Sequence, residues 1–135
     1  MVLTGGLKVS PQIAAVLKRS CMDCHSNATV WPWYSYVAPA SWLVERDVRR
    51  GRDHMNLSKW NQYDFKQQEK LLADIASAVK NRDMPLPQYT LVHRNSKLSD
   101  ADTDLIYGWA RMERRKLKAG HSVVRKDDGH LADGQ

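Results

Sequence analysis

Cys21-Met22-Asp23-Cys24-His25 is the stretch around which the rest of this chain has to fold. Residues three and four apart share one face of a helical turn, so both thiols and the imidazole point to the same side. Two thiols at this spacing can reach neighbouring vinyl groups on one edge of a porphyrin, and the imidazole then faces the iron. C-x-x-C-H is the attachment signature of c-type haem, so the sequence predicts one covalent haem c with His25 as an axial ligand.

Other uses of a C-x-x-C pair remain as alternatives. Half of a zinc site would need a second C-x-x-C or a closely spaced His pair, and the sequence has neither. A thioredoxin-like redox pair would need a βαβ pattern, which is not visible. The two cysteines also allow a structural disulfide. A zinc-binding or disulfide-bonded structural domain therefore stays open beside the haem hypothesis.

The bulk composition fits one soluble domain. The chain has 135 residues, 42% of them hydrophobic, and no run of about 20 apolar residues, so we expect no membrane span. The formal net charge is +6, but the basic residues are spread, with modest clusters over 46–52 and 111–118. No nucleic-acid motif accompanies them. The pattern favours solvated helix faces and an acidic docking surface on a partner protein, and does not indicate nucleic-acid binding.

Hydrophobic periodicity predicts an all-α fold of about four helices, which would pack around the one haem. The first helix is short and amphipathic, opens at Ser10-Pro11 and runs into the cysteine motif. The other predicted helices cover residues 41–50, which Gly51 would end, 63–80 and 99–118. Residues 1–9 are expected to be an unstructured lead, 10–118 the haem-binding domain and 119–135 a disordered tail.

The segment 26–40 holds two prolines and a string of aromatics, so it is predicted to be a loop against something apolar. We expect cofactor contacts from Trp31, Trp33, Tyr34 and Trp42, with Tyr36 and Trp60 completing an apolar shell that keeps water from the haem. The donor of a hydrogen bond to a haem propionate could be a Tyr, a Trp, Arg46 or Arg52. The sequence does not select among them.

The sixth ligand of the iron separates electron transfer from ligand chemistry. Met84 is the leading candidate because it precedes Pro85 in an extended segment between two helices, where its thioether would be presented at a fixed angle. The alternatives are His54 and Met55. The remaining Met and His side chains are assigned elsewhere: Met112 to the core, His93 to a hydrogen bond or solvent, His121 and His130 to the tail.

The order of these motifs resembles known haem proteins. Class I cytochromes c have the same order of motifs: C-x-x-C-H, then a late Met-Pro, here Met84-Pro85, then a helix opened here by Leu98-Ser99-Asp100. This resemblance implies a small cytochrome c-like bundle of about four helices around one haem. More closely, the chain is similar to the bacterial haem-binding domain family between about Ser10 and Met112. That similarity rests on CHSN at 24–27, WPWYS at 31–35, APASWL at 38–43, GR at 51–52 and NLSKW at 56–60. It implies haem attachment outside the cytoplasm, in the periplasm of a Gram-negative bacterium.

The functional hypothesis is an electron carrier, or an electron-transfer module, with His/Met axial ligation and a redox partner protein. The alternative is a haem enzyme or gas sensor with an open or displaceable sixth position. His54 with Arg52 is a weak candidate for the His-Arg pair that a peroxidase has on the distal side of its haem. Residues 1–8 are too short and too polar for a signal peptide. We therefore expect an export signal to precede this segment in the natural gene.

Overall fold

The computed structural model describes residues 2, 3 and 5–130, with side chains up to residue 125. Within that part the fold is all-α, as predicted, and Val2 and Lys8 form a single antiparallel bridge. The α-helices are α1 Pro11–Ser20, α2 Met22–His25, α3 Ala40–His54, α4 Phe65–Lys80, α5 Pro87–Val92 and α6 Asp100–His130. Three 3-10 turns accompany them: η1 Trp33–Tyr36, η2 Leu57–Gln62 and η3 Arg94–Ser96.

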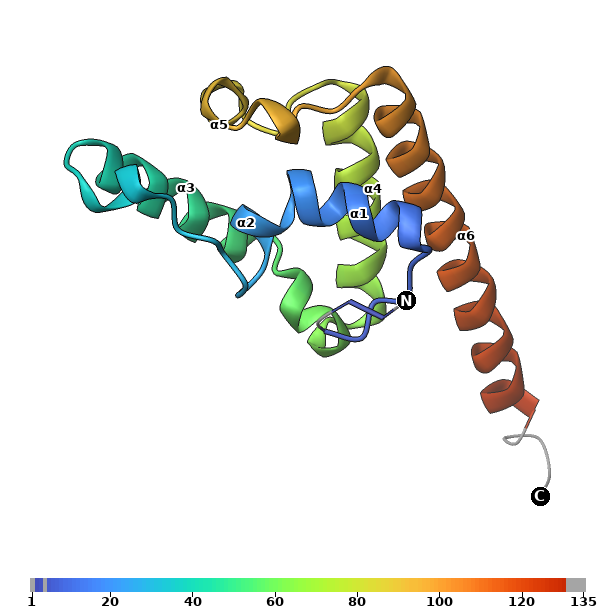
Figure 1. Ribbon diagram of the computed structural model, residues 1–135. Helices are drawn as coiled ribbons and strands as arrows, with labels where there is room; N and C mark the ends of the chain where they lie inside the picture. The colour runs from blue at the N-terminus through green and yellow to red at the C-terminus, as the bar shows by residue number, and fades with distance from the viewer. Residues whose placement is uncertain (1, 4, 131–135) are drawn as a thin grey trace.

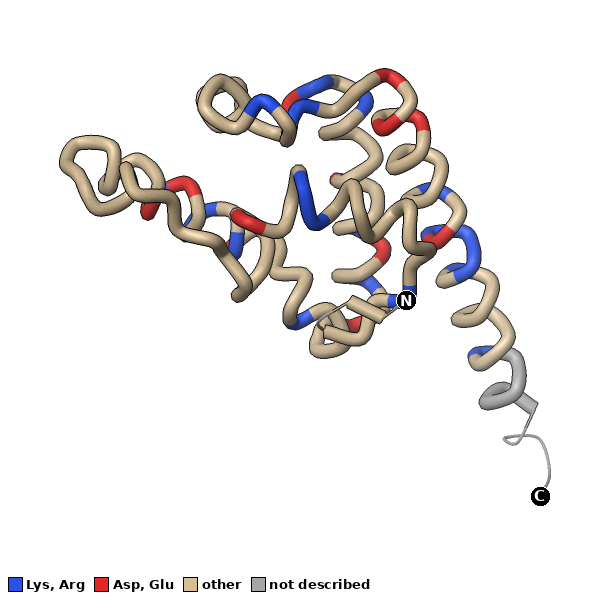
Figure 2. Tube along the Cα trace, in the orientation of Figure 1, with Lys and Arg blue, Asp and Glu red and all other residues tan. Residues whose placement is uncertain are grey.

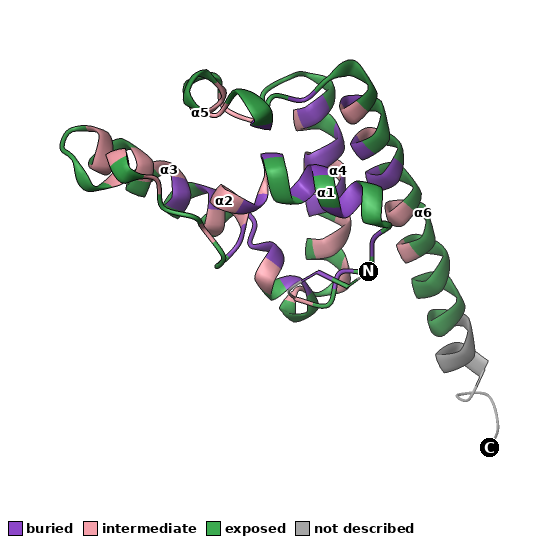
Figure 3. Ribbon diagram, viewed as in Figure 1, coloured by how far each residue is buried: buried purple, intermediate pink, exposed green. Residues whose placement is uncertain are grey.

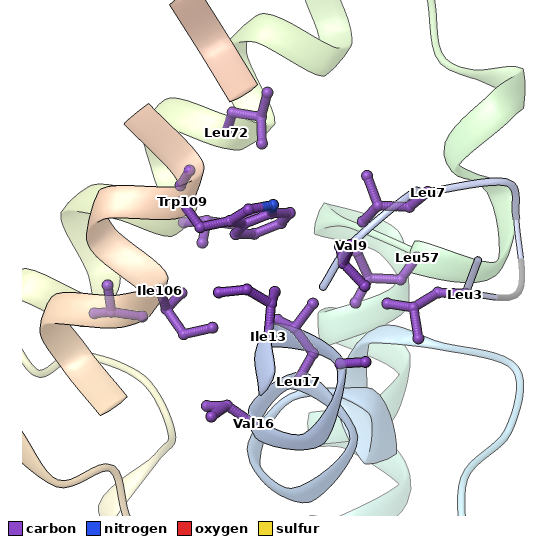
Figure 4. Packing of buried hydrophobic residues seen from close by; sticks show 14 of the residues in the cluster. Leu3, Leu7, Val9, Ile13, Val16, Leu17, Leu57, Leu72, Ile106 and Trp109 are labelled. Carbon is purple, nitrogen blue, oxygen red and sulfur yellow. The ribbon is translucent and has the colours of Figure 1, made fainter. Parts of the chain in front are cut away.

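The core forms where α1 crosses the antiparallel pair α4 and α6 (Figure 1). Ile13 and Leu17 of α1 meet Ile106 and Trp109 of α6, with Leu72 of α4 close by (Figure 4). These side chains recur at the helical spacing seen in the sequence, so the three helices each bury one apolar stripe. The buried residues accordingly lie on the facing sides of α1, α4 and α6, whereas α3 and α5 are mostly exposed or half-buried (Figure 3).

Helix starts follow the predicted capping signals. The Ser10 hydroxyl accepts a hydrogen bond from the Ile13 N–H, and Pro11 is the first residue of α1. At the start of α6, Ser99 and Asp102 bond each other reciprocally, since each side chain accepts from the other's backbone N–H at 3.0 Å. The four predicted helices thus correspond to α1, α3, α4 and α6.

The N-terminal segment departs from the prediction of an unstructured lead. Leu3, Leu7 and Val9 are buried beside Leu57 (Figure 4). The Gly5 carbonyl accepts a hydrogen bond from the Asn61 N–H at 2.9 Å. The three buried residues have irregular spacing, which shows no periodicity, and their partners lie about 50 residues away. Local sequence therefore gave no sign that this segment closes the core.

The helices differ from the prediction in three places. α3 continues through Gly51 to His54, and α6 continues beyond residue 118 to His130. The short helix α5 was not predicted, and its first residue, Pro87, is the last residue of the segment expected to be extended. A helix of one or two turns has no measurable periodicity, which is why α5 was missed, whereas the helical turn predicted for the cysteine motif is α2. Of the predicted tail, residues 131–135 lie outside the described residues.

Helices α2 and α3, with η1, form an arm that extends away from the α1–α4–α6 core, and α5 lies across from it (Figure 1). Helix α3 packs mainly on α2 and η1, and α5 mainly on η3. Both charge signs occur along α3 (Figure 2). Among the described helices, none has the length and apolar character needed to cross a bilayer.

Candidate functional site

A pocket of about 500 Å³ lies between the arm and α5, within the roughly 300–1,000 Å³ range of cofactor sites. Cys21, Cys24 and His25 contribute to its wall from α2 and the residue before it. Met84 and His93, more than 50 residues later, contribute from the segments on either side of α5. The structure therefore brings the C-x-x-C-H motif and the leading sixth-ligand candidate to one mostly apolar cavity.

The imidazole of His25 is held in one orientation by backbone oxygens. Its Nδ1 lies 2.9 Å from the Gly51 carbonyl and 3.0 Å from the Met55 carbonyl. A carbonyl can only accept, so Nδ1 carries the proton and Nε2 keeps its lone pair. Burial lowers the pKa of His25, which keeps the ring neutral at neutral pH. A neutral imidazole with one nitrogen fixed by a carbonyl is the form that ligates a metal through the other.

Gly51 is the reason that α3 can approach α2 so closely. A Cβ at this position would lie 2.6 Å from the Cys24 carbonyl oxygen and 3.1 Å from the Cys24 Cβ. Only glycine leaves that space free. Gly51 was expected to end a helix, but its role is to let the helix pass beside the cysteine motif while its carbonyl bonds His25.

The two cysteines are free thiols, so the structural disulfide has no support here. Burial raises the pKa of Cys21 to about 12 and, with the Asp23 charge, that of Cys24 to about 11. Across the described residues, no three His, Cys, Asp or Glu side chains gather as a metal site would require.

The sixth-ligand candidates are separated by their positions. Met84 lines the pocket and is 38% exposed. His54 also lines it, but its Nε2 lies 3.4 Å from the Asp74 carboxylate. Met55 is buried in the core and does not line the pocket. Of the three, Met84 is the side chain that reaches the pocket without a polar partner of its own.

The predicted aromatic shell is largely elsewhere. Tyr34 lines the pocket and its hydroxyl meets Nε2 of His93. Trp33 and Trp42 are 78% and 69% exposed, and neither lines the pocket. Three other shell residues are also displaced: Trp31 lines a separate surface depression, Tyr36 is exposed, and Trp60 is buried in the core.

The sequence reasoning missed Tyr89. Its hydroxyl donates to the Asp23 carboxylate at 2.6 Å, inside the cysteine motif, and its ring stacks on His93 at 4.5 Å between centroids. Burial and the hydrogen bond to Asp23 raise the pKa of Tyr89 well above its usual range. Tyr89 thus ties α5 to α2 across the pocket. Its one local signal was Pro87, which opens α5.

Two residues assigned to the last helix and tail also differ. Met112, expected in the core, is exposed, because α6 buries the stripe of Thr103, Ile106 and Ala110 instead. His121, expected in an inert tail, lies on α6 and stacks on Phe65 at 3.8 Å between ring centroids. The side chain of His130 lies outside the described part of the chain.

Comparison with known proteins agrees with this site. A family model described as "Haem-binding domain" matches residues 3–112, so the chain belongs to the haem-binding domain family and its cofactor is haem. The chain is also 25% identical over 110 residues to a protein named cytochrome c peroxidase Ccp from Escherichia coli (strain K12). The match covers 79% of this chain but 24% of that relative. No solved structure matches.

Proposed function

We propose that this chain is a c-type cytochrome domain for electron transfer, carrying one haem bound through Cys21 and Cys24. His25 and Met84 would be the axial ligands. The observation that carries the proposal is the shared pocket, since it brings together two thiols, an oriented imidazole and a thioether from segments far apart in the sequence. Bound haem supplies one-electron redox chemistry at its iron.

The residues present fit this cofactor. Each thiol would add its S–H across a vinyl group, which forms a thioether without net oxidation, and both cysteines line the mostly apolar pocket. The carbonyls of Gly51 and Met55 fix the orientation of the His25 imidazole, and burial lowers its pKa. A Met thioether as the second axial ligand raises the reduction potential relative to a second imidazole.

Haem c attachment outside the cytoplasm forms part of the same proposal, with the periplasm as the compartment. The mature domain would pass electrons to a redox partner protein with an acidic docking surface, consistent with the net charge of +6.

The ligation is tested with Met84→Ala, using Met55→Ala as the matched control. Intact mass under denaturing conditions should first show one covalent haem in all three proteins. Met84→Ala should then lose the weak red absorption band of Met-ligated ferric haem, bind carbon monoxide and fall in potential. Met55→Ala should keep the band and lose about 2–5 kcal/mol of stability, because its side chain is buried. An unchanged spectrum in Met84→Ala would make His54 the leading ligand.

A haem enzyme or gas sensor is the second candidate. It is favoured by the partial exposure of Met84, which suits a displaceable ligand, and by the peroxidase name of the relative. Rapid carbon monoxide binding to the unmodified protein would support it over electron transfer.

A further inference from the structure

Two arginines of α3, Arg46 and Arg50, line the haem pocket. They are four residues apart and so lie on one flank of the helix. Among the described residues, the Arg50 side chain makes no hydrogen bond or ion pair, and the Arg46 side chain hydrogen-bonds to its neighbour Asp47 at 3.3 Å. Guanidinium groups beside a mostly apolar cavity need an anionic partner if a ligand covers them.

The other two arginines of α3 are engaged elsewhere. Arg52 donates from Nε to the Ser26 carbonyl and from Nη2 to the Thr29 hydroxyl, both at 2.8 Å. Arg49 pairs with Glu45 at 2.7 Å and borders a separate surface depression. Arg52 therefore holds the loop after the cysteine motif, and the guanidinium groups left for a ligand are those of Arg46 and Arg50.

The position of Arg46 and Arg50 along α3 determines which part of a bound haem they would contact. Gly51 contacts Cys24, and the helix rises about 1.5 Å per residue, so Arg50 and Arg46 start about 1.5 and 7.5 Å further along the axis. The pocket follows α3 in that direction, because Ala40, Val44 and Val48 also line it. In haem, the vinyl groups that cysteines modify and the two propionates lie at opposite edges. A haem anchored at Cys21 and Cys24 would therefore extend its carboxylates along this flank.

We propose that Arg46 and Arg50 bind the two propionate carboxylates of the haem. The assignment rests on the proposed c-type attachment, which fixes the vinyl edge. A guanidinium fork matches a carboxylate in a bidentate arrangement, and the charge-assisted hydrogen bonds are strengthened next to an apolar cavity. Asp47, which also lines the pocket, keeps Arg46 oriented and is itself bonded by Gln88.

The test uses the holoprotein and the variants Arg46→Gln, Arg50→Gln and the double substitution, with Arg49→Gln as the matched control. Intact mass first establishes that the covalent haem is retained. The propionate bending modes of the resonance Raman spectrum should then shift to lower wavenumber, and the potential should fall, in the pocket variants. The potential falls because removing a positive charge near the haem favours ferric iron. Arg49→Gln should change neither.

Arg50→Lys keeps the charge and removes the fork, so it should preserve the potential while still shifting the propionate modes. It also serves if the glutamine variants fail to fold. Propionate modes and potential that stay unchanged in both Arg50→Lys and the double variant would overturn the assignment. Wild-type protein without covalent haem would instead refute the proposed function, so the two failures are distinguishable.

Discussion

Replacing Gly51 with alanine should weaken the protein although alanine is the better helix former. The added Cβ would stand 2.6 Å from the Cys24 carbonyl oxygen, and an ordinary van der Waals separation begins near 3.4 Å. α3 must therefore move from α2 by about 0.8 Å, since the atom in the way belongs to the backbone. A displacement of that size is enough to break the 2.9 Å contact between Nδ1 of His25 and the Gly51 carbonyl.

The expected magnitude combines three effects. Overpacking costs about 1–3 kcal/mol. Loss of the His25 hydrogen bond adds roughly 0.5–1.5 kcal/mol. The better helix propensity of alanine offsets about 1 kcal/mol of this destabilisation. The net expectation is a destabilisation of about 0.5–3.5 kcal/mol, accompanied by a changed potential because the imidazole loses a fixed partner.

Gly108→Ala is the matched control. Gly108 lies within α6, and a Cβ there meets nothing within 4 Å. It should stabilise the protein by about 0.5–1 kcal/mol through helix propensity alone. Urea unfolding, followed by circular dichroism, measures the stability of both variants. The urea midpoint should fall for Gly51→Ala and rise for Gly108→Ala, while the dependence of the free energy of unfolding on urea concentration stays constant. Equal stabilisation by the two substitutions would refute the close approach of α3 to the cysteine motif.

Three further predictions concern side chains other than the axial-ligand candidates. Tyr89→Phe removes the hydrogen bond to the Asp23 carboxylate, so it should lower the free energy of unfolding by about 1.5–3 kcal/mol, measured by urea titration. The hydrogen bond from the Ser99 N–H holds the pKa of Asp102 below its usual range, so this stabilisation is present above the unfolded-state pKa and lost as pH falls through the native one. Asp102→Asn should thus cost about 0.5–1 kcal/mol at neutral pH and nothing in acid, which thermal melts across pH would show. In the described part of the chain the Thr103 hydroxyl is buried without a hydrogen-bond partner, so Thr103→Val should raise the free energy of unfolding by about 1 kcal/mol; a lower free energy of unfolding would mean that the hydroxyl has a partner.

Local spacing was sufficient for much of this protein. The spacing within Cys21–His25 and the caps at Ser10 and Ser99 depend on residues within one helical turn. The predicted starts of α1 and α6 were accordingly confirmed, as was the all-α class. The haem cofactor also followed from five consecutive residues and agrees with the family match over 3–112.

Tertiary structure decided which side chains of each helix are buried, which are exposed and which line the pocket. His54 and Met55 are adjacent, yet the former reaches the pocket and the latter enters the core. Trp33 and Trp42 point outward because no further layer of the described chain covers the arm. Spacing shows which residues share a face, but burial depends on contacts with segments far away in sequence. The sequence by itself therefore determined the C-x-x-C-H motif and the positions of the four longer helices, and only the packing of α3 and α5 around the pocket determined which side chains line it.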